Sequence, residues 1–323
     1  MRPTCGRLQL LSGFVGFMLL VVLAGHQWYM SDEKKEERIY QAQEVRRQLI
    51  REMCEHDEAA FSRGIHRFEN LTYAELDNIL VDDENGFIFC YIPKVACTSW
   101  RRVMVVLSRG EPYQDPVSIS KGIAHNPKGI PKLRDSPEIE MKAKLKHYTK
   151  FLFVRDPFVR ILSAYRDKFM GLNGVYYYFS KLIMRRYSNI PNPPETAEEA
   201  FSSHMRPSFH NFVQYLLDLN TESPLAFDPH WRPMYRLCHP CLIDYDFIGH
   251  QESFHEESMQ LLSILKLGDT IKFPPSNINM TTTDTVLEWF KTVPLEDRRR
   301  LFKLYEEDFR LFGYSEPKKL LDG

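Results

Sequence analysis

Two short polar segments hold the side chains of this chain that are best suited to binding an anion. In the first, Lys94 is followed by the hydroxyl pair Thr98 and Ser99; in the second, Arg155 is followed by Ser163. Ammonium, guanidinium and hydroxyl groups all donate hydrogen bonds that phosphate and sulfonate oxygens accept. If the hydroxyl pair opens a helix, backbone N–H groups and the helix dipole add to the attraction. The segments therefore predict binding of a phosphorylated ligand.

Each polar segment follows a run of residues typical of a strand that is buried on both faces. Residues 87–92 and 151–154 are continuously apolar, as expected of central strands in a parallel sheet. Because ligands collect beyond the carboxyl ends of parallel strands, both segments are expected to face one crevice. Each run is followed, after a short turn, by apolar residues at helical spacing, namely Trp100, Val103, Met104 and Leu107, then Phe158, Ile161, Leu162, Tyr165 and Phe169.

The rest of the chain completes the prediction of an α/β domain with a central, mostly parallel sheet flanked by helices. A third strand is expected at residues 246–248, and helices at 252–266, 284–291 and 296–312. The first turn lacks the G-x-x-x-x-G-K-[ST] sequence of a Walker A loop, which argues against an ordinary ATPase or kinase. Taken alone, this turn also fits a helix cap. The second turn, at the end of another buried strand, favours a ligand site.

The sequences of both turns are similar to those of a known enzyme family. Residues 93–100, Pro-Lys-x-x-x-Thr-Ser-Trp, resemble the 5′-phosphosulfate loop of sulfotransferases that use 3′-phosphoadenosine 5′-phosphosulfate (PAPS), and residues 155–165 resemble their 3′-phosphate motif. Residues 90–100, 151–158, 237–241 and 245–249 resemble the Golgi carbohydrate sulfotransferases, nearest to the chondroitin 4-O-sulfotransferases. The resemblance spans residues 80–314. The chain departs from it at Ser99-Trp100-Arg101, where Asn-Trp-Lys is expected, and at Asp156, where Glu is expected.

This resemblance implies a P-loop-like sulfotransferase fold that uses PAPS as sulfonate donor and no metal. Lys94 would hold the oxygen that bridges phosphate and sulfonate. Arg155 and Ser163 would bind the 3′-phosphate, a task that suits a bidentate guanidinium, and Arg160 would support the site or pair with an acid. The donor contacts implied for the two turns are Pro93, Lys94, Val95, Ala96, Cys97, Thr98 and Ser99, and Arg155, Asp156, Pro157, Phe158, Val159, Arg160, Ile161, Leu162 and Ser163.

The acceptor that the resemblance implies is the 4-hydroxyl of N-acetylgalactosamine in chondroitin or dermatan. Two other acceptors stay open, N-acetylgalactosamine of N-glycans and a terminal uronic acid. A lumenal glycan-binding protein with the same fold and no catalysis is a further alternative. Binding a glycan alone would require neither Lys94 nor Arg155, which favours an enzyme.

The net charge of −1 excludes the uniformly basic balance of a nucleic-acid packager, and no nucleic-acid partner is expected.

A sugar hydroxyl that attacks sulfur must lose its proton, so the reaction requires a general base. Two histidines lie between the polar segments, His125 in a Gly/Pro-rich loop from Gly122 to Pro131 and His147 on a lysine-rich helix. We expect His125 to be the base, because such a loop can project over the crevice.

Contacts to the acceptor are expected from Lys142 and Lys146, since an anionic glycan requires a cationic surface. These lysines, which cluster with Lys144 and Lys150, fit equally well the solvated face of a helix. His230 and Trp231 are both suited to stacking against a sugar ring, although an aromatic residue next to prolines is more commonly a packing element. Of the two, Trp231 is the expected acceptor contact.

The beginning of the chain is typical of a membrane anchor. Residues 8–31 contain no charged side chain, Arg2 and Arg7 precede them, and Asp32 and Glu33 follow, so the positive-inside rule puts the body of the protein in the lumen. We expect a cytosolic tail at 1–7, a transmembrane signal-anchor at 8–30, a lumenal stem at 31–79 and a lumenal sulfotransferase domain at 80–323. A signal peptide cleaved after Ala24 is the alternative.

This topology predicts a single-pass type II protein of the Golgi membrane, with a helical stem through which a homodimer could form. The sequons at Asn70 and Asn279 are then accessible to glycosylation. Cys5 would be cytosolic, and the other five cysteines would meet an oxidising lumen. The C-x-x-C motif at Cys238 and Cys241 favours a structural disulfide over a metal site. Pairing within the motif and pairing to Cys54, Cys90 or Cys97 are both open.

Overall fold

The computed structural model describes residues 34–57, 61, 67–126, 129–218, 227–275, 281 and 283–322. The expected tail and transmembrane segment, Cys5 and the sequon at Asn279 lie outside these residues. Within them, no helix combines the length and the apolar character needed to cross a bilayer. The chain divides into two compact units, Met1–Val45 and Arg46–Gly323. Residues 34–45 of the first and 46–56 of the second are helical. Residues 46–79, expected in the stem, thus belong to the same compact unit as the sheet.

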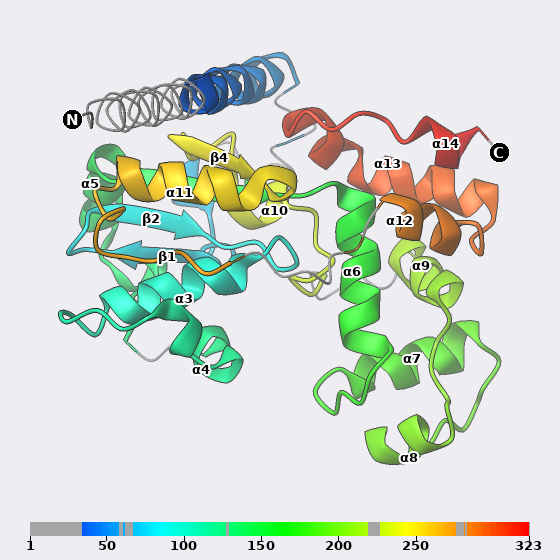
Figure 1. The fold of residues 1–323 in the computed structure, drawn as a ribbon. Coiled ribbons are helices and arrows are strands. Elements are labelled where there is room, and N and C mark those ends of the chain that lie inside the picture. Colours follow the sequence, from blue (N-terminus) through cyan, green and yellow to red (C-terminus); the bar gives the residue numbers. More distant parts are fainter. Residues whose placement is uncertain are drawn as a thin grey trace, which may run out of the picture. The chain divides into compact units, whose positions relative to one another are not determined.

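Among the described residues, a four-stranded sheet in the order β1-β2-β3-β4 organises the second unit (Figure 1). β1 (Ile79–Asp82) is antiparallel to β2 (Phe87–Cys90), whereas β3 (Thr149–Val154) is parallel to β2, and β4 (Phe247–His250) is parallel to β3. Every residue of β2 and all but the first of β3 are buried. The α/β class and the mostly parallel sheet are therefore confirmed. The edge strand β1 was not predicted.

Helices lie along the sheet and beyond the ends of its strands. Figure 1 shows α3 and α11 beside the sheet, and α6, α9, α12 and α13 gathered to one side of it. The helices expected after residues 252, 284 and 296 are confirmed as α11, α12 and α13. The α-helices are α3 (Cys97–Leu107), α4 (Lys121–His125), α5 (Glu138–His147), α6 (Pro157–Phe169), α7 (Tyr177–Tyr187), α8 (Ala197–Ser202), α9 (Phe209–Leu217), α10 (Tyr235–Cys238), α11 (Phe254–Ile264), α12 (Thr283–Phe290), α13 (Leu295–Leu311) and α14 (Lys318–Leu321). Short 3-10 helices are Phe68–Asn70, Pro116–Ser118, Leu133–Asp135 and Gln251–Ser253.

The apolar core has two main clusters, one around the sheet and one among α6, α9, α12 and α13. Trp100 of α3 is fully buried in the first cluster, and its Nε1 donates to Ser258 Oγ of α11 at 3.1 Å. On β4, Gly249 lies against the ring of Phe153, where an added Cβ atom would approach the ring to 2.1 Å. A glycine is therefore required at this position. These contacts fix the strands whose ends carry the two polar segments.

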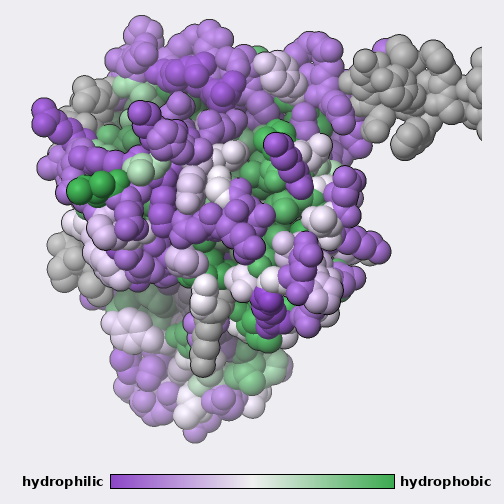
Figure 2. Space-filling view, turned by 90° about the vertical axis from the view of Figure 1, so that its left-hand side faces the viewer, coloured by the Kyte–Doolittle hydropathy of each residue, from purple (hydrophilic) through white to green (hydrophobic). Residues whose placement is uncertain are grey.

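The surface is mixed in character. Figure 2 shows that hydrophilic side chains cover most of one face, with hydrophobic side chains visible between them. Such a mixture is ordinary for a folded protein, and it agrees with a charged fraction of 26%.

Two disulfides join distant parts of the second unit. Cys54 pairs with Cys241 across 187 residues, and Cys90 pairs with Cys238 across 148. Among the described residues, Cys97 is the free cysteine, and it is buried. Each cysteine of the C-x-x-C motif therefore pairs outside the motif, and neither keeps a thiolate for a metal.

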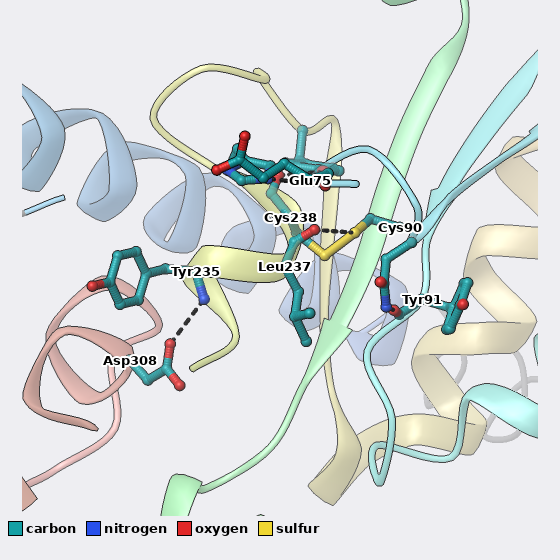
Figure 3. Close-up of a disulfide and its surroundings, with 10 residues drawn as sticks. Glu75, Cys90, Tyr91, Tyr235, Leu237, Cys238 and Asp308 are labelled. Carbon is teal, nitrogen blue, oxygen red and sulfur yellow. Dashed lines mark hydrogen bonds between the residues drawn. A yellow bond between two sulfur atoms is a disulfide. The ribbon is translucent and has the colours of Figure 1, made fainter. Parts of the chain in front are cut away.

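The segment that ends at Cys238 is held from two sides. The Cys90–Cys238 disulfide joins α10 to the end of β2 (Figure 3). Asp308 of α13 accepts hydrogen bonds from the backbone N–H groups of Met234 and Tyr235 at 2.7 and 2.9 Å. Burial raises the pKa of Asp308 to about 6, although the two N–H groups favour the charged carboxylate. The start of α10 is thus fixed relative to both core clusters.

Candidate active site beyond strands β2 and β3

The turn between β2 and α3 carries the first polar segment. Helix α3 begins at Cys97, so Thr98 and Ser99 lie in its first turn, as predicted. Lys94 and Ala96 have left-handed backbone with φ of 74° and 65°, which costs a residue with a side chain roughly 1–2 kcal/mol. No side chain caps the first N–H groups of α3. A strained turn that leads into such a helix is suited to binding an anion through backbone N–H groups.

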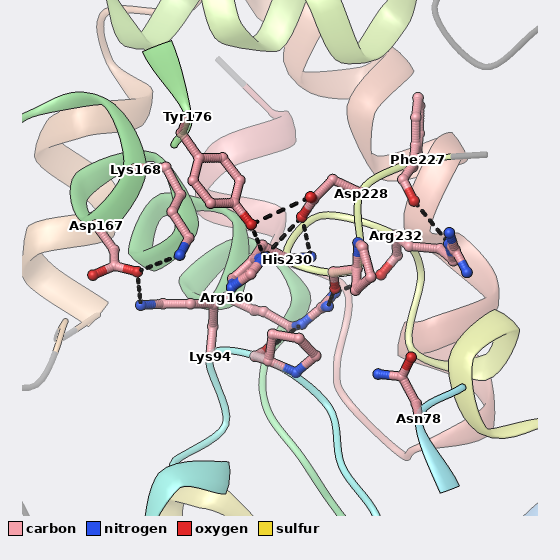
Figure 4. A network of polar contacts seen from close by, with 12 residues as sticks. Asn78, Lys94, Arg160, Asp167, Lys168, Tyr176, Phe227, Asp228, His230 and Arg232 are labelled. Carbon is pink, nitrogen blue, oxygen red and sulfur yellow. Dashed lines mark hydrogen bonds and ion pairs between the residues drawn. The ribbon is translucent and has the colours of Figure 1, made fainter. Parts of the chain in front are cut away.

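The side chain of Lys94 lies beside two charged residues of α6. Its Nζ is 3.2 Å from Asp167 Oδ2, and Nζ of Lys168 is 3.2 Å from the same oxygen (Figure 4). Burial lowers the pKa of Lys94, and Asp167 counteracts part of this effect. Burial also raises the pKa of Asp167, but the two ammonium groups outweigh it and hold that pKa at about 2. Two positive charges thus share one carboxylate, and the excess positive charge attracts an anion.

The second polar segment lies next to the first, as expected of neighbouring parallel strands. Arg155 follows β3 and is 6% exposed. Its Nη1 donates to the Lys94 carbonyl at 3.1 Å, and its Nη2 donates to the Thr281 carbonyl at 3.2 Å. Its buried Nε has no hydrogen-bond partner among the described residues. Burial lowers the pKa of Arg155, but a guanidinium stays charged in proteins. Ser163, on α6, is half-buried. Arg155 therefore braces the turn of Lys94.

Asp156, expected to contact the donor, is the N-terminal cap of α6. Its Oδ1 accepts from the backbone N–H groups of Phe158 and Val159 at 2.9 and 3.0 Å. Replacing it by alanine should lower the free energy of unfolding by about 1 kcal/mol because the cap is lost, whereas Asp156→Asn keeps an acceptor oxygen and should cost less. Urea denaturation measures both differences. An alanine variant as stable as the asparagine variant would contradict the capping role.

Four apolar residues that were expected to contact the donor have their side chains in the core. Val95 of the first turn and Phe158, Ile161 and Leu162 of α6 are all 0% exposed. Burial excludes a side-chain contact with a ligand and leaves only their backbone for that purpose. The three α6 residues occupy the same apolar face that predicted the helix.

Arg160, also expected at the donor, instead holds backbone carbonyls together. It is 1% exposed. Its Nε donates to the Pro93 carbonyl at 3.0 Å, its Nη1 to the Arg232 carbonyl at 2.7 Å and its Nη2 to the Pro229 carbonyl at 2.7 Å. Every guanidinium nitrogen is thus bonded to a carbonyl. The expected supporting role fits this geometry and a direct phosphate contact does not. Arg160 is a positioning residue that joins the turn of Lys94 to residues 229–232.

A second polar group lies near Lys94, and the sequence analysis, which considered His230 only for stacking against a sugar, did not predict it. His230 Nδ1 is 2.7 Å from Asp228 Oδ1 and 2.9 Å from the Tyr176 hydroxyl oxygen (Figure 4). The ammonium of Lys168 lies 4.3 Å from the centre of the Tyr176 ring, which connects this group to the pair formed by Lys94 and Asp167. The only sequence signal is the triplet Asp-Pro-His, far along the chain from both turns.

His125 lies at the first turn, although its expected loop is partly helical. It is the last residue of α4, which Ser120 caps by accepting from Ile123 N. His125 Nε2 is 3.1 Å from Thr98 Oγ1, and the His125 carbonyl accepts from Arg101 at 2.8 Å. Burial, with further help from the charge of Arg101, lowers the pKa of His125 to about 4. The imidazole is therefore neutral at neutral pH.

The structure does not bring the α5 residues to Lys94. One residue separates the end of helix α5 from the start of β3, so Lys142, Lys146 and His147 precede β3, whereas the polar turns follow the carboxyl ends of β2 and β3. Figure 1 shows α5 at the end of the sheet away from α6. Lys142 forms ion pairs of 2.9 Å with Glu69 and Glu138, which fits the solvated helix face that was the alternative.

Trp231 is not an acceptor contact in this structure. It is 0% exposed and packs against the rings of Phe169, Phe179 and Phe212. The expectation of sugar stacking is wrong because the ring fills the core next to His230.

Of the two sequon asparagines, Asn70 lies among the described residues, and its side chain is exposed.

The fold and the site define a class of protein, an α/β group transferase with two cationic turns at the ends of parallel strands, and the comparisons with known proteins agree. The profile described as "Sulfotransferase family" matches residues 77–315. The chain belongs to the sulfotransferase family, and its curated relatives are carbohydrate sulfotransferases.

Three of these relatives show the extent of the similarity. Carbohydrate sulfotransferase 12 of Mus musculus is 44% identical over 92% of this chain and 74% of its own length. Carbohydrate sulfotransferase 11 of Mus musculus is 36% identical over 86% of this chain and 77% of its own length. Carbohydrate sulfotransferase 9 of Homo sapiens is 30% identical over 88% of this chain and 62% of its own length. No solved structure gives a significant match.

Proposed function

We propose that this carbohydrate sulfotransferase takes its sulfonate group from PAPS, with Lys94 at the reacting centre. The observation that carries the proposal is the junction of the two cationic turns, where Arg155 bonds to the carbonyl of Lys94 at 3.1 Å. Three further features fit a donor with several anionic groups: the uncapped N–H groups of α3, the excess positive charge of Lys94 and Lys168 over Asp167, and the partnerless Nε of Arg155.

In the proposed reaction, the sugar hydroxyl attacks sulfur while the bond between sulfur and the phosphate oxygen breaks. Negative charge develops on that oxygen, and the ammonium of Lys94 stabilises it. Thr98 and Ser99 bind the 5′-phosphate together with the N–H groups of α3, and Arg155 and Ser163 bind the 3′-phosphate. The proton of the sugar hydroxyl passes to a base of the protein, for which His125 was the expected group.

The proposed acceptor is the 4-hydroxyl of N-acetylgalactosamine in chondroitin or dermatan. The resemblance of residues 237–241 and 245–249 to chondroitin 4-O-sulfotransferases supports it. The names of the relatives state only that they act on carbohydrate. N-acetylgalactosamine of N-glycans and a terminal uronic acid are the competing acceptors.

We propose the Golgi membrane as the site of action, with a single-pass anchor. The uncharged run at residues 8–30 and the charges that flank it support a cytosolic tail at 1–7 and a lumenal body from residue 31, whose stem is shorter than expected because residues 46–79 belong to the compact unit of the sheet. Two disulfides fit an oxidising compartment. Asn70 and Asn279 are the proposed glycosylation sites, and the stem is the proposed route to a homodimer.

Donor and acceptor are tested separately. We expect 3′-phosphoadenosine 5′-phosphate to raise the melting temperature while ATP does not, because a ligand at 100 times its Kd stabilises the native state by about 2.7 kcal/mol. Desulfated chondroitin and dermatan should accept sulfate from labelled PAPS at carbon 4 of N-acetylgalactosamine. Equal stabilisation by the two nucleotides would contradict the donor, and transfer confined to N-glycans or terminal uronic acid would contradict the acceptor.

A further inference from the structure

We infer that His230 is the catalytic base of the proposed transfer and that Asp228 and Tyr176 position it. The inference rests on the proposed function, and it assigns the proton transfer to a different histidine from His125. It is carried by the arrangement of these three side chains beside Lys94 and Lys168 (Figure 4).

Hydrogen bonds hold His230 through its backbone and through one side of its imidazole ring. The backbone N–H of His230 donates to Asp228 Oδ1 at 2.9 Å, and the ring atom Nδ1 is 2.7 Å from the same oxygen. Tyr176 donates its hydroxyl to the other carboxylate oxygen, Oδ2, at 3.3 Å. A carboxylate can only accept, so Nδ1 carries the proton of the neutral ring. The lone pair is then on Nε2, for which the described residues supply no hydrogen-bond partner.

This arrangement has the parts that a base requires. An aspartate that binds one ring nitrogen fixes the tautomer and stabilises the imidazolium that forms when the other nitrogen accepts a proton. The side chains of His230 and Asp228 are 19% and 17% exposed, so neither is freely solvated. Arg160 holds the carbonyl of Pro229, between the two residues, at 2.7 Å, which fixes the backbone of the pair.

The charges that face His230 keep it ready to accept a proton. Burial lowers its pKa below the ordinary 6.5, the ammonium groups of Lys168 and Lys94 lower it further, and Asp228 raises it. The charge that His230 carries when protonated is in turn one of the smaller effects that lower the pKa of His125. At neutral pH His230 is unprotonated, and the same lysines that attract the donor prevent a proton from occupying Nε2 in advance.

His125 is less suited to the reaction. Its Nε2 already faces the Thr98 hydroxyl at 3.1 Å, and the largest influences on its pKa, burial and then the charge of Arg101, both disfavour its protonated form. It orients Thr98 in the first turn. In the assigned step, the proton of the sugar hydroxyl moves to His230 Nε2 as the sugar oxygen bonds to sulfur, and the leaving phosphate oxygen keeps its electron pair beside Lys94.

The test compares H230Q, H125Q and D228N with the wild type, each assayed for transfer from PAPS across pH. H230Q should lower kcat by about 10²–10⁴-fold, the usual contribution of a general base, and should lose the acidic limb of the pH–rate profile. H125Q should keep that limb. Because Asp228 raises the pKa of His230, D228N should move the acidic limb to lower pH. Thermal stabilisation by 3′-phosphoadenosine 5′-phosphate reports in every variant whether the donor site is intact.

The outcomes separate this inference from the proposed function. A wild type without transfer would overturn the proposed function itself. If the wild type transfers sulfonate and H230Q keeps its kcat and acidic limb, or H125Q removes a limb near pH 4, His230 is not the base. If 3′-phosphoadenosine 5′-phosphate no longer stabilises H230Q, its donor site is damaged and the pH–rate profile of D228N becomes the test. An acidic limb of D228N at the same pH as that of the wild type would overturn the assignment of His230.

Discussion

Replacing Lys94 by alanine should lower kcat for sulfonate transfer by at least about 10²–10³-fold, the cost of removing one donor from a developing oxyanion. The change removes a positive charge as well as a donor, so the loss should reach the upper end of this range. The side chain is 18% exposed and paired with Asp167, so the ammonium that is lost is a mostly buried one held in place by a carboxylate. Initial rates at saturating PAPS and acceptor measure the effect.

The control for Lys94→Ala is Lys121→Ala. Nζ of Lys121 is 4.0 Å from Asp167, and its side chain is 71% exposed, so its removal should change kcat by less than about fivefold, the limit for an exposed ion pair. The alanine adds no backbone strain at position 94, because alanine and lysine are equally disfavoured at the left-handed φ of 74°. Normal turnover by Lys94→Ala would refute the proposed mechanism.

Replacing Arg160 by methionine should lower the free energy of unfolding by about 3–5 kcal/mol. The variant leaves the carbonyls of Pro93, Pro229 and Arg232 without their donor, and an unsatisfied buried polar group costs roughly 1–3 kcal/mol. Removing the buried charge offsets part of this sum. Transfer should fall as well, since the turn of Lys94 and the segment of His230 lose their common anchor. Chemical denaturation and initial rates measure the two effects.

Arg166→Met is the matched control, because Arg166 lies on the same helix and is exposed. Its guanidinium bonds to the Thr281 hydroxyl at 3.3 Å, and its replacement should change stability by no more than about 0.5 kcal/mol. If Arg160→Met denatures at the same urea concentration as Arg166→Met, the three carbonyls do not depend on Arg160.

The parts of this fold that the sequence predicts are those with a local signal. Strands β2 and β3 are buried on both faces and therefore read as unbroken apolar runs, which located Lys94 and Arg155 at their ends. Strand β1 has no such signal, because it is a four-residue edge strand that ends in Asp82. That the two polar turns lie next to each other follows from the parallel pairing of β2 and β3, because the carboxyl ends of parallel strands meet at the same end of the sheet.

The parts that the sequence does not predict depend on contacts between distant segments. The role of a buried arginine on the apolar face of a helix cannot be predicted from its own sequence segment. At Arg160 the role depends on three carbonyls from two other segments, which accept hydrogen bonds from the guanidinium. Asp228 and His230 lie in an irregular segment without periodicity, so nothing local relates them to Lys94. The sequence around Trp231 is compatible with a buried ring and with an exposed one, and the contacts made by the folded chain determine that the ring is buried.

The two disulfides bear on how the chain acquires its native form during synthesis. Translation proceeds from the amino terminus, so Cys54 and Cys90 are made 187 and 148 residues before Cys241 and Cys238. In the second unit, the thiols available until then are those of Cys54, Cys90 and Cys97, and any bond among them is non-native and has to be broken by thiol–disulfide exchange. Correct pairing therefore requires either that these thiols stay reduced until Cys238 and Cys241 are made or that exchange corrects the early bonds, and burial of Cys97 in the folded unit then removes its thiol from competition.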